Sequence, residues 1–146
     1  MSSNLNAALA VFGRFCLSAI FFVSAWRKLE DPAAVATHLT AAVAQAAWAP
    51  EALAVGVRQA GPLLAWAAIG FEFVGAFCLV TGFKKEFGAA LLVIFLVPTT
   101  LLFHPPQDPA QLTQFLKNIG LIGGLLLVAS SPPGGRGAQA QAFFTS

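Results

Sequence analysis

Charged residues are scarce in this chain. Asp, Glu, Lys and Arg together make up 10% of its 146 residues, whereas soluble domains carry about 25%. Hydrophobic residues make up 58% and the mean hydropathy is +0.77, so there is too little polar surface to cover a water-soluble globule. The composition therefore excludes a soluble domain and predicts one integral membrane domain. The formal net charge of +2 is too small to indicate a nucleic-acid partner.

Cysteine and catalytic motifs are also scarce. Cys16 and Cys78 are the two cysteines, both within apolar runs, where cysteine usually behaves as a small hydrophobe. Two cysteines at this spacing make no metal motif. The sequence also lacks a Ser/His/Asp grouping and a phosphate loop, so we expect no enzyme activity, no metal, no cofactor and no soluble substrate. The N-terminus lacks the basic region and cleavage site of a secretory signal, so the first apolar run is expected to stay as a span.

Long apolar runs are abundant. A membrane span needs about 20 mostly apolar residues, and four segments qualify: residues 7–26, 61–83, 87–104 and 112–131. The turn Lys84-Lys85-Glu86 is so short that the second and third spans must be antiparallel neighbours. We predict an all-α integral membrane fold, a four-transmembrane-helix bundle over residues 1–131, followed by a flexible C-terminal tail over residues 132–146.

The segment between the first two spans, residues 32–60, is too polar to span and too apolar to be a free loop. Asp31 before Pro32 is a good helix start, because the side chain caps the helix and proline suits the first turn. We predict an amphipathic interfacial helix with Trp48 as an anchor at the membrane surface. Three basic residues fall on each side of the membrane, so the positive-inside rule does not decide the topology.

Three charged residues, Arg14, Glu72 and Lys117, lie within predicted spans. A charge at a span centre costs about 2.5–3.5 kcal/mol, so such residues normally face the bundle interior and pair. At a rise of 1.5 Å per residue they lie about 10, 16 and 20 Å from the side of the termini. We therefore predict a buried charge cluster of Arg14, Glu72 and Lys117, with Asn118 beside it.

Small residues recur on the same helix faces. Gly75 and Gly82 follow Glu72 at helical spacing, and Gly120 and Gly124 form a GxxxG after Lys117, a pattern that permits close helix approach. We predict that spans one, two and four pack around the charges, with span three outside. Two interpretations stay open: the charges only specify helix packing, or they form a ligand, lipid or proton site. Further candidates for ligand or interface contacts are Lys28, His104, Trp26 and Trp48.

Three stretches resemble the DoxX-like superfamily of small four-span membrane proteins: GRFCLSAIFFVSAWRKLEDP, FEFVGAFCLVTGFKKEFGAALLVIFLVPTTLLFH and LTQFLKNIGLIGGLLLVASS. The resemblance is carried by Arg14, the SAW of residues 24–26 with Lys28, Glu72 with Gly75, and the FLKN of residues 115–118. The branch that looks most similar is that of the HR-like lesion-inducing proteins, which are related to the surfeit-locus-four cargo receptors.

The composition, the buried charges and this resemblance together leave three functions open. The first is a non-catalytic accessory or structural subunit of a larger, respiratory-type membrane complex, with lipid and other membrane subunits as partners. The second is a receptor for a lipid, quinone or cargo that uses the buried charges. The third is a redox enzyme or its membrane anchor, with a chromophore or a reactive thiol. The mitochondrial inner membrane is the favoured location, with the endoplasmic reticulum and the bacterial inner membrane as alternatives.

Overall fold

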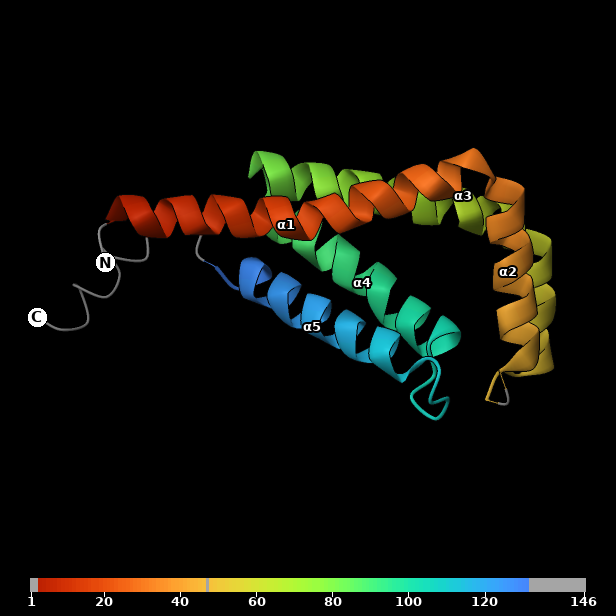
Figure 1. The fold of residues 1–146 in the computed structure, drawn as a ribbon. Coiled ribbons are helices and arrows are strands. Elements are labelled where there is room, and N and C mark those ends of the chain that lie inside the picture. Colours follow the sequence, from red (N-terminus) through yellow and green to blue (C-terminus); the bar gives the residue numbers. More distant parts are fainter. Residues whose placement is uncertain (1–2, 47, 132–146) are drawn as a thin grey trace, which may run out of the picture.

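The structure is a computed structural model that describes residues 3–46 and 48–131, and the predicted tail 132–146 lies outside this part. Within it the chain forms five helices (Figure 1): α1 (Ser3–Glu30), α2 (Pro32–Gln45), α3 (Glu51–Thr81), α4 (Lys85–Phe103) and α5 (Leu112–Ala129). All except α2 are long and apolar enough to cross a membrane. This confirms the predicted fold class, four spans with a shorter helix between the first two.

Helix α1 is longer than the predicted first span at both ends. Every side chain described between residues 4 and 13 is exposed, and Figure 1 shows this part of α1 extending past the other helices. At its other end α1 continues beyond Trp26 and places Arg27 and Lys28 in its last turn. Cations are favourable there because the helix dipole is negative at its C-terminus. Lys28 is thus a helical residue with a fixed direction.

Helix α2 begins as predicted. Asp31 is its N-cap, and a side-chain oxygen of Asp31 accepts the backbone N–H of Ala34 at 2.9 Å. Pro32 occupies the first turn, where its missing N–H is not needed. Helix α2 runs across the direction of α1 rather than along it (Figure 1). This is the direction predicted for a helix that lies on the membrane surface.

Helix α3 begins at Glu51, ten residues before the predicted start of the second span. Its 31 residues would measure about 46 Å if straight, more than the hydrocarbon core of about 30 Å. The helix is instead bent: its first part lies along α2 and its later part along α1 (Figure 1). Pro62 lies inside it, and an internal proline removes one helical hydrogen bond and kinks the helix. The prediction that residues 51–60 belong to the interfacial segment is therefore wrong, because they form the first part of one continuous helix that proline bends.

Helices α3 and α4 are antiparallel neighbours, as the short turn predicts. The turn uses Gly82 with φ 75° and Lys84 with φ 46°. The two helices approach closely where glycines meet, because a Cβ added at Gly88 would lie 2.5 Å from Cβ of Cys78. Helix α4 packs against both α3 and α5, while α1 barely touches α5. The prediction that the third span lies outside the others is therefore wrong, because its small residues let it sit centrally.

Candidate functional site

An ion pair between Lys28, in the last turn of α1, and Glu72 joins α1 to α3. Nζ of Lys28 is 2.7 Å from both carboxylate oxygens of Glu72, and Oγ of Ser24 donates to Oε1 of Glu72 at 2.8 Å. The side chain of Glu72 is 2% exposed and that of Lys28 is 24% exposed. Removing a carboxylate from water is costly unless it is paired and hydrogen-bonded. Helix α1 supplies both groups that meet this need.

The register of α1 against α3 explains why Lys28 is the partner. Ten residues separate Arg14 from Ser24 on α1, and ten separate Gly82 from Glu72 on α3. Ser24 bonds Glu72, and a Cβ added at Gly82 would lie 3.2 Å from a terminal nitrogen of Arg14, so both contacts belong to one antiparallel register. Lys28 lies one turn beyond Ser24, and helical side chains lean toward the N-terminus of their helix. The lysine therefore reaches back onto Glu72.

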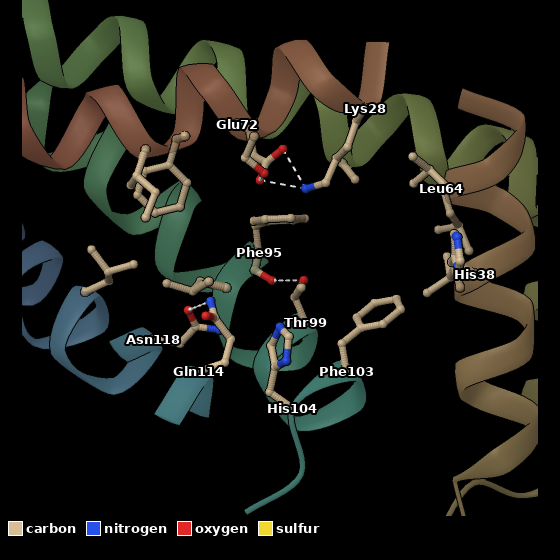
Figure 2. Close-up of a pocket in the computed structure, with 18 residues that line it drawn as sticks. Lys28, His38, Leu64, Glu72, Phe95, Thr99, Phe103, His104, Gln114 and Asn118 are labelled. Carbon is tan, nitrogen blue, oxygen red and sulfur yellow. Dashed lines mark hydrogen bonds and ion pairs between the residues drawn. The ribbon is translucent and has the colours of Figure 1, made fainter. Parts of the chain in front are cut away.

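Helix α4 covers the ion pair from a third side. Nζ of Lys28 lies 4.7 Å from the ring centroid of Phe95, within the range of a cation–π contact. Lys28 is thereby held by a carboxylate and a ring at once. Figure 2 shows Phe95 lying between the ion pair above it and the polar residues of α4 and α5 below.

A cavity of about 430 Å³ adjoins the ion pair. Every helix contributes to its wall, most of which is apolar, and Lys28 and Glu72 lie at one side (Figure 2). The lining residues are Ile20, Phe21, Ser24, Lys28, Val35, His38, Leu39, Leu64, Ala68, Glu72, Phe95, Leu96, Thr99, Phe103, His104, Gln114, Asn118 and Leu121. A volume of about 300–1,000 Å³ and an apolar wall with a few polar groups are typical of small-molecule sites.

A second polar group lies across the cavity from the ion pair, on α4 and α5 (Figure 2). Nδ2 of buried Asn118 donates to Oγ1 of Thr100 at 3.0 Å, and Nε2 of Gln114 donates to Oδ1 of Asn118 at 3.4 Å. Nearby, Nδ1 of His104 is 2.7 Å from Oε1 of Gln111. The cavity thus has polar groups at two sides and an apolar wall between them, an arrangement that can orient an amphiphilic molecule.

The predicted charge cluster does not form, because Glu72 pairs with Lys28 instead of Arg14 or Lys117. Lys117 is exposed, so the prediction that it lies buried beside Glu72 is wrong. It is near the start of α5, and a long lysine stem there can reach the membrane surface. Arg14 is at the Gly82 end of α3, where a cation is favourable at the helix C-terminus. Asn118 is buried and lines the cavity, but it bonds Thr100 rather than Glu72.

The predicted packing glycines have different roles. A Cβ at Gly75 would lie 2.5 Å from Cγ of Leu92 on α4, and one at Gly124 would lie 3.3 Å from Leu17 on α1. Gly82 ends α3 in the left-handed conformation. Gly120 has nothing within 4 Å of an added Cβ, so the prediction that it forms a packing contact is wrong. It lies on the exposed face of α5, one turn from Gly124.

Of the four further candidates, Lys28 and His104 line the cavity, whereas Trp26 and Trp48 are exposed. Trp48 lies on another hollow beside the end of α2. Sequence reasoning missed Ser24, which follows from the register of α1, since it stands one turn before Lys28. It also missed the residues that reach the cavity from α2 and α4, and no local motif marks these.

A comparison with protein-family models gives a match that covers most of the helices described above. The DoxX family model matches residues 9–105, a stretch that runs from α1 through α4 and includes Lys28 and Glu72. A comparison with curated proteins finds no match, and a comparison with solved structures finds none either. Because the matched stretch covers more than half of the sequence, the chain belongs to the DoxX family.

Proposed function

We propose that this DoxX-family membrane protein is a receptor that binds an amphiphilic small molecule, a lipid or a quinone, in the cavity beside Lys28 and Glu72. The single observation that carries the proposal is the cavity itself, since it brings polar groups from α1, α3, α4 and α5 to an otherwise apolar space. Molecules dissolved in a bilayer have the matching character, an apolar body with a polar part.

The ion pair supports binding beyond helix packing. A pair that only joined α1 to α3 would be best enclosed by apolar side chains, whereas Lys28, Ser24 and Glu72 all line the cavity. Ser24 and Lys28 both donate hydrogen bonds to Glu72. Part of the Lys28 side chain nevertheless stays exposed, and Lys28 lines the cavity. A polar group of a ligand would therefore meet an oriented ammonium in a site of low dielectric constant, where hydrogen bonds are strong.

The proposal is tested by filling the cavity. Ala68 lines it, and Val74 lies on the same helix with its side chain exposed and away from it. Wild type, Ala68→Trp and the control Val74→Trp would be extracted in mild detergent, and their retained lipids and quinones identified by native mass spectrometry. We expect a molecule that wild type and Val74→Trp retain and Ala68→Trp loses. Equal retention by all three would overturn the proposal, and a second filling variant, Leu64→Trp, covers a folding failure of the first.

A second candidate function is that of a non-catalytic accessory subunit in a larger membrane complex. It is favoured by residues 4–13 of α1, which extend past the other helices and expose Leu5, Leu9 and Phe12. An apolar segment of this kind suits contact with another membrane subunit. The resemblance to HR-like lesion-inducing proteins and the mitochondrial inner membrane as location belong to this second proposal. Migration only as a monomer in blue-native gels, with no co-purifying protein, would refute it.

A further inference from the structure

Three hollows follow one another along α2. The central cavity described above adjoins a head cavity of about 410 Å³ at the start of α2, and the two share five lining residues, among them Ser24, Lys28 and His38. At its other end the central cavity meets an end cavity of about 730 Å³, with which it shares Phe103. Helix α2 packs mainly against α3 and scarcely against α1 and α4. Three hollows therefore lie one after another beside α2, from its first turn to its last.

The head cavity is lined by an arginine, Arg27, that has no carboxylate partner among the residues that the structure describes. Arg27 and Asp31 line it together with Lys28. Lys28 is neutralised by Glu72, whereas Arg27 forms no ion pair with any carboxylate in residues 3–46 and 48–131. The carboxylate of Asp31 already accepts the N–H of Ala34 as the cap of α2. The exposed guanidinium of Arg27 is thus available to an anion at this end, beside the ammonium of Lys28.

The shape and the charge together specify a ligand class. We propose that the site binds a long-chain amphiphile with an acidic head group, a carboxylate or a phosphate, with the head beside Arg27 and the chain beneath α2 toward Phe103. This inference rests on the proposed function and narrows it. Arginine presents a planar fork of donors that suits both anions. The apolar wall of the central cavity suits an alkyl chain, and an acidic head group, unlike a neutral quinone, offers Arg27 a charge to pair with.

The head group is tested with three probes of equal chain length: oleate, oleoyl-lysophosphatidate and oleyl alcohol. Binding to the full chain in nanodiscs of a neutral lipid would be measured by native mass spectrometry. We expect the acids to bind about tenfold more tightly than the alcohol, and Arg27→Gln to remove this difference. Arg58→Gln is the control, because Arg58 is exposed as Arg27 is but lines none of the three hollows. The tighter acid identifies whether the natural head is a carboxylate or a phosphate, and either supports the inference.

A substitution at Asp31 tests whether the head group of the ligand is negatively charged. Asn caps helices as well as Asp does, so Asp31→Asn removes a charge from the head cavity and keeps the start of α2. Acid binding should stay equal or become tighter. Weaker acid binding would overturn the inference, because it would mean that Asp31 holds a cationic part of the ligand.

The position of the ligand's alkyl chain is tested at the other end of α2. Ala42 lines the end cavity, whereas Ala44 is exposed and lines none of the hollows. Ala42→Trp should weaken binding of oleate about tenfold and leave decanoate unchanged, while Ala44→Trp should change neither. Equal binding of oleate and oleyl alcohol with no effect of Arg27→Gln would refute the inference and leave the proposed receptor function intact. If Ala68→Trp changes nothing either, the proposed function fails as well.

Discussion

The ion pair between Lys28 and Glu72 makes a quantitative prediction. Breaking a buried pair by removing one partner costs about 3–5 kcal/mol, because the other charge stays buried. Lys28→Met would leave Glu72, which is 2% exposed, with only the hydroxyl of Ser24, so the full cost of about 3–5 kcal/mol is expected. Glu72→Gln would leave Lys28, which is 24% exposed and can turn its ammonium outward, so we expect a smaller cost of about 2–3 kcal/mol.

The double variant Lys28→Met with Glu72→Gln leaves no unpaired charge. Its cost should therefore be smaller than the sum of the single costs, by a coupling energy of about 1–3 kcal/mol. Reversible unfolding by dodecyl sulfate in mixed micelles, followed by tryptophan fluorescence, measures all four proteins. The ion pair between the adjacent residues Lys85 and Glu86, at 3.4 Å, is the control and should give a coupling energy of about 0–1 kcal/mol. Additive effects at Lys28 and Glu72, or a larger cost for Glu72→Gln than for Lys28→Met, would refute the reasoning.

Three further predictions concern packing and exposure. Gly88→Ala should lower the unfolding free energy by about 1–3 kcal/mol, because the added carbon would meet Cβ of Cys78 at 2.5 Å. Gly120→Ala, where an added carbon meets nothing within 4 Å, should raise it by about 0.5–1 kcal/mol. Equal effects of the two substitutions in the same unfolding assay would contradict this prediction. Gly82→Ala should cost about 1–2 kcal/mol, because φ is 75° there, and thermal melting in detergent would show no shift if the turn tolerated alanine. Lys117→Gln should change stability by less than about 0.5 kcal/mol, since its side chain is exposed; a loss of several kcal/mol would restore the buried position predicted from the sequence.

The elements of the fold could be predicted because they follow from local patterns. Four apolar runs of the right length, a three-residue turn and the Asp31-Pro32 helix start each act within a few residues of the chain. The bend of α3 could not be predicted from residues 51–59 alone. Pro50 and Pro62 look alike as helix breakers, and contact with α2 near Gly61 favours the continuous helix at the second of them.

The partner of Glu72 does not follow from depths counted from the helix ends. That count assumes that every helix starts at the same membrane plane, whereas α1 begins well outside the bundle. Fixing Arg14 opposite Gly82 instead would have placed Ser24 beside Glu72 and Lys28 one turn further. The cavity was beyond prediction, because residues from five helices line it and no single pattern reports how five helices pack.

Photolabelling tests most directly whether the cavity binds an amphiphile. A fatty acid with a mid-chain diazirine would be irradiated with the protein in nanodiscs, with and without excess oleate, and the labelled residues mapped by mass spectrometry. The positions of the labels on α4 distinguish the outcomes. Phe95 and Thr99 line the cavity, whereas Ile94 and Val97 are exposed on the outer face of the helix. The account predicts labels on Phe95 and Thr99 that oleate removes. Labels confined to Ile94 and Val97, unchanged by oleate, would contradict it.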